Sequence, residues 1–306
     1  MDEIYDLLII GSGPAGLAAA IYAQRARLHA AVIEKLPASG GQVLNTVDVD
    51  NYPGLPGVGG YELGMKFKEH ADHLGAVFLD DTIKEIRDQK DRKILLGEKD
   101  RYVAKAVIIA TGAMHRELGV PGEGELKGRG VSYCATCDGA FFRNKTVAVI
   151  GGGDVALEDG IFLSRMCKKV YLIHRRDRLR GAKSLQETFL SRDNAQVLWD
   201  TVVEEIQGAG RVENIKLKNV KTGQASDLPV QGVFIAVGIV PQSDAFTGLV
   251  EMEGGYIRAG EDCVTSVPGI FAAGDVRTTH LRQVLTAAAD GANAVASAER
   301  YLESIR

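Results

Sequence analysis

The sequence predicts an α/β fold made of two similar units, with the second unit inserted in the first. A strand, a glycine-rich turn, a helix and a second strand follow one another twice, and the first glycines of the two copies, Gly11 and Gly151, are 140 residues apart. Each copy is later closed by an apolar strand that ends in small residues, and residues 257–306 repeat neither copy. A chain of 306 residues is long enough for two domains that each bury a core.

The first copy begins with the apolar segment 5–10, which predicts a buried strand. The turn Gly11-Ser-Gly13-Pro-Ala-Gly16 follows, then an Ala-rich helix over 17–27 and a second strand over 30–33 that ends at Glu34. This order, with an acidic residue 23 positions after the first glycine, is typical of a Rossmann-like dinucleotide-binding domain. The first glycine permits a sharp turn, the second lets the backbone approach a pyrophosphate, and the third lets helix and strand pack closely.

The second copy has the same order and the same spacing. A strand over 146–150 leads into Gly151-Gly-Gly153-Asp-Val-Ala156, and a helix is predicted over 157–166. The next strand, 170–173, ends at His174, again 23 residues after the first glycine. Ala156 replaces the third glycine, and an alanine there still allows close packing. Two copies in register are stronger evidence than a single glycine fingerprint.

The remaining segments define the domain boundaries. The closing strands are 107–112 and 233–238, and the Gly-rich, charged segment 121–130 is expected to be an exposed connection. Residues 257–306 offer a strand up to Asp275 and a helix over 283–304, which are expected to complete the first domain. The predicted domains are therefore 1–115 with 244–306, and 116–243.

The residues after the second strand of each copy indicate different ligands. A pyrophosphate is expected at each helix N-terminus, where unpaired N–H groups and the helix dipole favour anions. Glu34 offers a carboxylate to the hydroxyls of an adenosine ribose, which fits FAD or NAD. The segment His174-Arg175-Arg176, with Arg180, can instead bind a 2′-phosphate, so the second copy is expected to prefer NADPH. The alternatives are a glycine turn without a ligand and a solvated basic strand end.

The chemical centre of the sequence is Cys134-Ala-Thr-Cys137-Asp138. In such a pair one thiolate attacks a disulfide and its neighbour resolves the mixed disulfide, while Asp138 can hold or donate a proton. A zinc site is one alternative, but it needs four ligands, and Cys167 and Cys263 have no Cys or His partner at ligand spacing. The other is an inert buried pair. No metal is expected, and Cys167 and Cys263 are expected to be small core residues.

Composition and charge argue against a nucleic-acid-binding or membrane-spanning protein. The formal net charge is -4 without a long run of one sign, which argues against nucleic acid as a partner. The chain opens Met1-Asp2-Glu3 without a basic signal-peptide start, and no apolar stretch reaches the roughly 20 residues that span a bilayer. We therefore expect a soluble, cytoplasmic protein without a membrane partner. In the reducing cytosol a close cysteine pair is expected to be redox-active or metal-binding.

Over essentially its whole length the sequence resembles bacterial-type, low-molecular-weight thioredoxin reductase. The cysteine motif with its aspartate is the specific part of this resemblance, whereas the other pieces also occur in wider flavoprotein groups. The matching pieces are Gly11 to Gly16, Gly40-Gly-Gln42, Asn51-Tyr-Pro-Gly54, Ala110-Thr-Gly112, Cys134 to Asp138, Gly151 to Asp154, His174 to Arg176 with Arg180, Ala273-Gly-Asp275 and Arg282-Gln283.

The resemblance implies FAD in the first domain, NADPH in the second, and thioredoxin as the substrate of a thioredoxin-disulfide reductase. Cys137 is then the sulfur nearer the flavin, Cys134 the sulfur that attacks thioredoxin, and Asp138 the acid–base group. The resemblance also places Asp275 on the ribityl chain and the final helix near the isoalloxazine. The family is homodimeric, and its smaller domain rotates so that the dithiol and the nicotinamide reach the flavin in turn.

The motifs and the resemblance together define the expected cofactor-binding residues. Those expected to bind FAD are Gly11, Gly13, Pro14, Ala15, Gly16, Glu34, Lys35, Gly41, Gln42, Asn51, Thr111, Gly112, Gly274, Asp275, Arg282 and Gln283. Those expected to bind NADPH are Gly151, Gly153, Asp154, His174, Arg175, Arg176 and Arg180.

One departure from the family and four alternative functions stay open. Val155 stands where the family commonly has a Ser or Thr hydroxyl, which removes a donor worth about 0.5–1.5 kcal/mol, and the positive charge of Arg178 can offset this loss. The flavoprotein subunit of a peroxide-reducing system shares these motifs but normally carries an N-terminal thioredoxin-like domain, which is not expected ahead of Gly11. A ferredoxin–NADP reductase would lack the cysteine pair. A flavin-based redox sensor is the non-enzyme alternative, and another small disulfide protein could replace thioredoxin as substrate.

Overall fold

The computed structural model describes residues 3–46, 49 and 51–305, and it divides the chain into two compact units. Unit 1 consists of Met1–Met114 and Val240–Arg306, and unit 2 of His115–Ile239. The divisions predicted from the sequence lie after residues 115 and 243. The chain leaves and re-enters unit 1 along β7 (Ala113–His115) and β16 (Ile239–Pro241), which pair with each other. The α/β fold expected from the sequence is confirmed.

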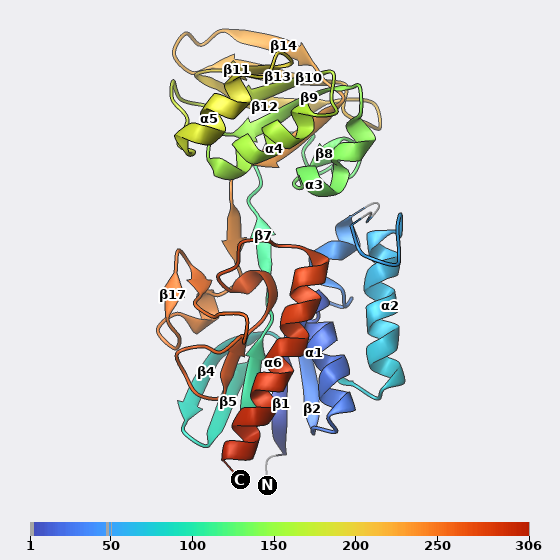
Figure 1. Cartoon of the computed structure of the whole chain (residues 1–306), viewed down its shortest axis with the longest axis vertical. Helices are drawn as coiled ribbons and strands as arrows, with labels where there is room; N and C mark the ends of the chain where they lie inside the picture. Colours follow the sequence, from blue (N-terminus) through green and yellow to red (C-terminus); the bar gives the residue numbers. More distant parts are fainter. Residues whose placement is uncertain (1–2, 47–48, 50, 306) are drawn as a thin grey trace. The chain divides into compact units, whose positions relative to one another are not determined.

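Unit 1 is built on a seven-stranded sheet (Figure 1). Its strands follow the order β3-β2-β1-β6-β5-β4, and β19 pairs with β6. The pairs that join β3, β2, β1, β6 and β19 are parallel, whereas β5 and β4 continue the sheet antiparallel. The strands are β1 (Ile4–Ile10), β2 (Ala30–Glu34), β3 (Val77–Asp80), β4 (Ile83–Gln89), β5 (Arg92–Gly97), β6 (Arg101–Ile109) and β19 (Ile270–Ala272).

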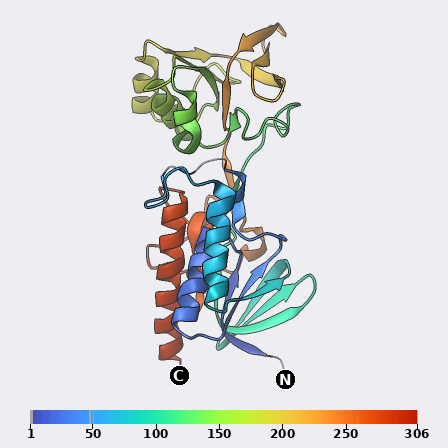
Figure 2. The ribbon, with the colours of Figure 1, turned by 90° about the vertical axis from the view of Figure 1, so that its right-hand side faces the viewer.

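Both faces of this sheet are covered, which explains why β1 is apolar along most of its length. Figures 1 and 2 show α1 (Pro14–Arg25), α2 (Gly60–His73) and α6 (Val284–Ser304) together along one side of the sheet. A Cβ atom at Gly291 would overlap the Ala15 carbonyl oxygen, so a glycine is needed where α6 crosses α1. The other face packs against residues of 246–276, which include β17 (Met252–Glu253) and β18 (Tyr256–Ile257).

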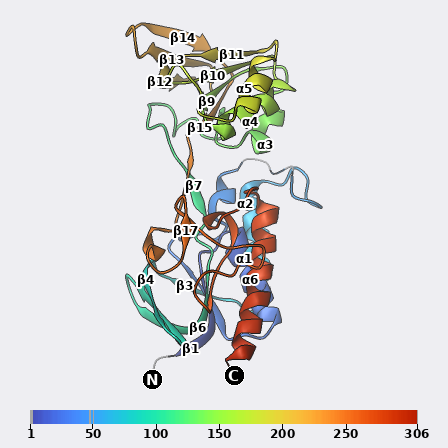
Figure 3. The ribbon, with the colours of Figure 1, turned by 60° about the vertical axis from the view of Figure 1, so that its left-hand side comes forward.

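Unit 2 has three layers (Figure 3). A parallel five-stranded sheet in the order β11-β10-β9-β15-β8 lies between helices on one face and the antiparallel sheet β12-β13-β14 on the other. The parallel strands are β8 (Val131–Ser132), β9 (Thr146–Gly151), β10 (Lys169–Ile173), β11 (Ala195–Leu198) and β15 (Gly232–Ala236). The other elements are β12 (Thr201–Gln207), β13 (Asn214–Asn219), β14 (Ala225–Pro229), α3 (Ala135–Asp138), α4 (Asp154–Ser164) and α5 (Lys183–Leu190).

The helices that follow the two glycine turns begin earlier than the sequence predicted. α1 begins at Pro14 rather than at residue 17, because the fixed φ of proline suits the first helical position. α4 begins at Asp154 rather than at residue 157, because the helix dipole favours the Asp154 carboxylate in the first turn. The predicted ends at residues 27 and 166 were also wrong, since α1 ends at Arg25 and α4 at Ser164.

Within the part of the chain that the structure describes, no helix combines the length and the apolar character that crossing a membrane requires.

Candidate functional site

The predicted redox pair forms a disulfide at the start of the short helix α3. Cys134 and Cys137 are bonded, with Cα atoms 5.3 Å apart, and both residues are half-buried. Cys134 is the N-cap residue of α3, and its Sγ accepts a hydrogen bond of 3.2 Å from the Cys137 N–H. The Cys134 N–H donates to Ser132 Oγ at 3.1 Å. Asp138, the predicted acid–base group, ends α3 and is also half-buried.

A buried carboxylate holds the residue that precedes Cys134. Glu123 is 3% exposed, and Tyr133 donates to its Oε1 at 2.7 Å. The other oxygen of Glu123 accepts from the backbone N–H of Gly119 at 2.8 Å. Burial, followed by the hydrogen bond of the Tyr133 hydroxyl to Glu123, raises the pKa of Tyr133 above its usual value. The expectation that 121–130 is an exposed connection was therefore wrong at Glu123 and at Leu126, because these two side chains fold inward.

The ring of Tyr133 also has neighbours on its faces. His115, the first residue of unit 2, stacks on it at 5.4 Å between ring centroids, and Lys127 Nζ lies 5.2 Å from its centroid. Burial, and then the charge of Lys127, lower the pKa of His115. The backbone immediately before the disulfide is thus fixed by one hydrogen bond and two ring contacts.

α3 and the turn after it pack against α4, which follows the second glycine turn. A Cβ atom at Gly139 would lie 2.9 Å from the Phe162 ring, so only a glycine fits there without displacement. Asp159, one turn before Phe162 on α4, is half-buried, and burial followed by the charge of Glu158 raises its pKa to about 7. The redox pair and the second glycine turn therefore belong to one rigid packing arrangement within unit 2.

In unit 1 the first glycine turn needs its glycines for different reasons. Gly11 has φ +101°, and a Cβ atom there would lie 2.5 Å from the Ala110 oxygen. A Cβ atom at Gly16 would overlap the Gly11 carbonyl oxygen, so this glycine permits the close contact of α1 with the turn. At Gly13 an added Cβ would meet nothing within 4 Å, and no side chain caps α1 there. Open space thus borders the N-terminus of α1.

Other predicted residues lie around this turn. Glu34, at the end of β2, accepts hydrogen bonds from Ser12 N at 2.7 Å and Ser12 Oγ at 2.6 Å, so one carboxylate oxygen orders the turn itself. Gly40 N donates to Ser12 O at 2.8 Å, and a Cβ at Gly41 would lie 3.0 Å from the Gly13 Cα. Lys35, directly after Glu34, is exposed.

Five more predicted residues have protein partners in unit 1. Asn51 Nδ2 donates to Gln283 Oε1 at 2.9 Å, although the two are 232 positions apart. Thr111 Oγ1 donates to the Gln242 oxygen at 2.6 Å, and Gln42 Nε2 donates to the Ala113 oxygen. Gly112, after β6, accepts from Gln242 N at 2.9 Å. These contacts bring segments from both ends of the chain to one edge of the parallel sheet.

Asp275 and Arg282 interact through their charges. Burial raises the pKa of the half-buried Asp275 to about 6, and the charge of Arg282 opposes that shift. Arg282 Nε is buried and has no hydrogen-bond partner among the described residues, and its guanidinium lies 4.3 Å from the Tyr256 ring centroid. A buried donor without a protein partner indicates a place where a ligand atom is expected.

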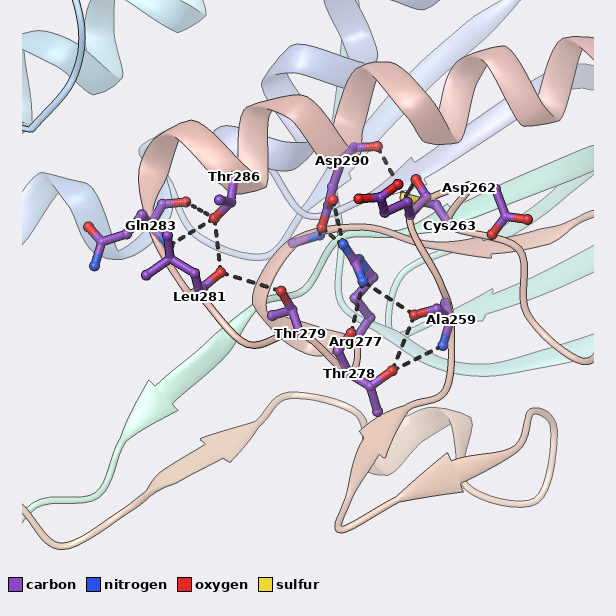
Figure 4. A network of polar contacts seen from close by, with 12 residues as sticks. Ala259, Asp262, Cys263, Arg277, Thr278, Thr279, Leu281, Gln283, Thr286 and Asp290 are labelled. Atoms are coloured by element: carbon purple, nitrogen blue, oxygen red, sulfur yellow. Dashed lines mark hydrogen bonds and ion pairs between the residues drawn. The ribbon is translucent and has the colours of Figure 1, made fainter. Parts of the chain in front are cut away.

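A buried ion pair that was not predicted from the sequence lies next to these residues (Figure 4). Asp290, on α6, accepts two hydrogen bonds of 2.7 Å from the Arg277 guanidinium and one of 2.9 Å from Gly274 N. A signal for it existed, because Asp290 interrupts the apolar stripe of α6 formed by Ala287, Ala294 and Ala298. Cys263, predicted to be a core residue, is buried and donates to the Asp290 backbone oxygen at 3.4 Å.

The second glycine turn, in unit 2, also has an open middle position. A Cβ atom at Gly153 would meet nothing within 4 Å, whereas one at Gly151 would lie 2.7 Å from the Ala156 Cβ. Asp154 Oδ1 accepts from Ala182 N at 2.7 Å, which draws the segment after the arginines onto the start of α4. Val155, which lacks the family's hydroxyl, is 50% exposed at this helix start.

The predicted basic segment folds back onto this second turn. His174 is 4% exposed, its Nε2 lies 3.0 Å from the Arg178 oxygen, and the ring lies against Gly152. The backbone N–H of Arg180 donates to the Gly152 oxygen at 2.7 Å. The side chains of Arg175, Arg176, Arg178 and Arg180 are exposed, and within the described part of the chain none of them forms an ion pair.

Comparisons with known proteins agree with this arrangement. Residues 5–291 match the family described as pyridine nucleotide-disulphide oxidoreductase. A thioredoxin reductase of Listeria innocua is 47% identical over 100% of this chain and 96% of its own length, and one of Bacillus subtilis is 46% identical over 100% and 97%. The crystal structure of thioredoxin reductase from Streptococcus pyogenes is 48% identical, has a TM-score of 0.95, and covers 99% of this chain and 100% of its own.

Proposed function

The chain belongs to the thioredoxin reductase family of pyridine nucleotide-disulphide oxidoreductases, and from this premise we propose that it passes electrons from NADPH, through FAD and the Cys134–Cys137 pair, to the disulfide of thioredoxin. The enzyme is an oxidoreductase that uses a flavin and a nicotinamide nucleotide. The observation that carries the proposal is the half-buried disulfide, which lies in the same unit as one of the two open glycine turns.

The residues of unit 1 fit FAD. The open backbone at Gly13 and the uncapped start of α1 suit a pyrophosphate, because free N–H groups and the helix dipole favour anions there. Asp275 and the unpaired Arg282 Nε offer an acceptor and a donor to polar parts of the ligand. Gly11 and Gly16 keep the turn tight, and Glu34 holds it through Ser12. Glu34 is the acceptor that we assign to the ribose hydroxyls. When bound, FAD supplies the two-electron exchange between the nicotinamide and the disulfide.

The residues of unit 2 fit NADPH rather than NADH. Gly153 leaves space at the start of α4 for a pyrophosphate, and Gly151 and Asp154 shape the turn around it. Arg175, Arg176 and Arg180 present unpaired guanidinium groups that can bind a 2′-phosphate with charge-assisted hydrogen bonds. His174 serves this site as a buried support for the arginine segment, through its contact with the Arg178 oxygen.

The dithiol chemistry is assigned to three residues. Cys134, the sulfur at the N-cap, attacks the thioredoxin disulfide, and the Cys137 thiolate then resolves the mixed disulfide and restores the Cys134–Cys137 bond. The position of Cys134 supports the attack, because a helix N-terminus and the Cys137 N–H stabilise a thiolate. Asp138 holds the proton that a leaving thiolate takes up.

We further propose for this chain several properties that are typical of the family. They include the FAD domain as residues 1–115 and 244–306, the NADPH domain as residues 116–243, a homodimer, rotation of the smaller domain, and a cytoplasmic location. Sedimentation of the purified protein tests the dimer, and limited proteolysis near Gly112 and Gly238 with and without NADPH tests the rotation.

The deciding experiment follows NADPH and NADH oxidation separately by the flavin-containing protein, with thioredoxin as acceptor. The wild-type protein is expected to oxidise NADPH rapidly only when thioredoxin is present, and Cys134→Ser is expected to abolish this while its flavin is still reduced by NADPH. Flavin reduction without transfer to thioredoxin would point to another small disulfide protein as substrate. A protein that purifies without flavin and binds none would refute the proposal.

A further inference from the structure

We propose that the buried Asp290–Arg277 ion pair is a positioning device for the FAD site, which holds the backbone of Gly274 and with it the side chain of Asp275. The inference rests on the proposed function, because it assumes that unit 1 binds FAD. Neither residue of the pair was among those expected to contact the cofactor, and neither is a catalytic residue.

The pair is bidentate and is removed from solvent. Asp290 is 6% and Arg277 is 7% exposed. Arg277 Nε donates to Asp290 Oδ2 and Arg277 Nη2 to Asp290 Oδ1, both at 2.7 Å, as Figure 4 shows. Asp290 Oδ2 also accepts from Gly274 N at 2.9 Å, so a single carboxylate oxygen joins the ion pair to the backbone of the turn that carries Asp275.

Arg277 extends the same connection to a second segment. Its Nη1 donates to the oxygens of Ala259 at 3.2 Å and of Thr278 at 2.8 Å. Thr278 Oγ1 lies 3.2 Å from the Ala259 oxygen and thus repeats this link. The pair therefore clamps the turn of residues 274–276 between α6 and the segment around residue 259 (Figure 4).

The clamped turn lies against the glycine turn that we assign to the pyrophosphate. Gly274 has φ +77°, and a Cβ atom there would lie 2.9 Å from the Ala15 Cβ at the start of α1. A small movement of Gly274 would consequently shift both Asp275 and its contact with α1. Asp290 also acts on Asp275 through its charge, since it adds to the burial that raises the pKa of that carboxyl.

Stability alone is a weak reason for such a pair, because apolar side chains of similar volume often replace buried ion pairs without loss. A double replacement therefore separates positioning from folding. Arg277→Met/Asp290→Asn removes both charges but leaves an amide oxygen to accept from Gly274 N. Arg277→Met/Asp290→Leu removes that acceptor as well. The two variants differ mainly in whether the Gly274 N–H has a partner.

The measurement is the affinity of the flavin-free full-length protein for added FAD, read from flavin fluorescence, together with the absorption spectrum and reduction potential of the bound flavin. We expect the Asn double variant, which keeps an acceptor for the Gly274 N–H but loses the ion pair, to bind FAD about three- to tenfold more weakly than wild type. We expect the Leu double variant to bind at least tenfold more weakly and to shift the flavin spectrum. Lys93→Met/Asp88→Asn is the matched control, because Lys93 is a buried partner of Asp88 in the same unit at 2.6 Å.

Equal FAD affinity and spectrum in the Leu double variant and in this control would overturn the inference. If the Leu variant does not fold, Arg277→Lys decides instead, because it keeps the charge but loses the two-bond geometry. A three- to tenfold loss of FAD affinity in Arg277→Lys supports positioning, and an unchanged affinity overturns it. A wild-type protein that binds no FAD overturns the proposed function, and the inference with it, before any variant is compared.

Discussion

Replacing Tyr133 by Phe tests whether the buried Glu123 carboxylate acts on the redox pair or only on the fold. The change removes one hydroxyl, which donates to Glu123 Oε1 at 2.7 Å, and it keeps the ring that stacks on His115. Tyr133 directly precedes Cys134, the N-cap residue of α3, so this hydroxyl restrains the backbone from which the first cysteine projects. The variant therefore loosens the dithiol without touching either sulfur.

Two magnitudes follow from this contact. A hydrogen bond to a charged group contributes about 1.5–3 kcal/mol, so the unfolding free energy is expected to fall by that amount. Only part of this change in free energy affects the redox equilibrium of the dithiol. If the loosened backbone regains about 1 kcal/mol of conformational entropy in the reduced form, the effective concentration of the two thiols falls roughly fivefold to tenfold. The reduction potential then becomes less negative by about 20–30 mV.

The assay equilibrates the purified protein anaerobically in dithiothreitol buffers of defined ratio, traps the free thiols with a maleimide, and counts them by mass spectrometry. Tyr102→Phe is the matched control. Tyr102 donates at 3.0 Å to Asp81, a carboxylate that is 2% exposed, and it lies on β6 in unit 1. We expect the two variants to lose similar stability and only Tyr133→Phe to shift the potential of the Cys134–Cys137 pair. A potential equal to that of wild type, at the expected loss of stability, would refute the reasoning and leave Tyr133 with a structural role.

The glycine turns, the arginine segment and Asp159 give three further tests. Gly13→Ala is expected to keep the unfolding free energy within about 0.5 kcal/mol of wild type but to weaken FAD binding at least tenfold. Gly16→Ala is expected to lower the unfolding free energy by about 1–3 kcal/mol. Calorimetry measures the stability of the two variants, and FAD titration measures their affinity. Arg176→Ala is expected to raise the KM for NADPH about tenfold or more and to leave that for NADH nearly unchanged, and equal effects on both coenzymes would count against a 2′-phosphate site. Asp159 has a folded-state pKa of about 7, above its unfolded value, so the folded protein binds the proton more tightly and loses stability as the pH rises from about 4 to 7. Asp159→Asn should therefore raise the unfolding free energy by about 1–3 kcal/mol at pH 8 and by almost nothing at pH 4. Urea titrations at the two pH values measure this difference, and an equal change at both would contradict the prediction.

Much of the fold could be predicted because local patterns determine it. The apolar run before Gly11 becomes β1, and the run before Gly151 becomes β9, each followed by its helix. The long final helix was predicted within one residue of its start at Val284. The antiparallel sheet β12-β13-β14 was not predicted, although β13 alternates apolar and polar residues, because its pairing depends on contacts with the sheet of unit 2.

In the site, too, short-range sequence patterns could be interpreted, whereas tertiary contacts could not be predicted. The disulfide of Cys134 and Cys137 could be predicted, since both cysteines lie within one turn of chain. The Asp290–Arg277 pair and the inward turn of Glu123 could not, because each carboxylate is bound by groups that only tertiary packing brings to it. His174 was expected at the nucleotide, and the structure shows its ring buried against Gly152 of the second glycine turn, an orientation that no sequence pattern predicts.

The insertion of unit 2 has a consequence for the synthesis of the protein. Unit 2 is one continuous segment, His115–Ile239, and can fold as soon as it leaves the ribosome. The sheet of unit 1 receives β19 beside β6, and α1 receives α6, only after residues 270–304 have been made. The redox disulfide is therefore expected to acquire its surroundings before the flavin site is complete. A released chain that ends near residue 245 should already protect unit 2 from protease, while its first 114 residues remain sensitive and unable to retain FAD.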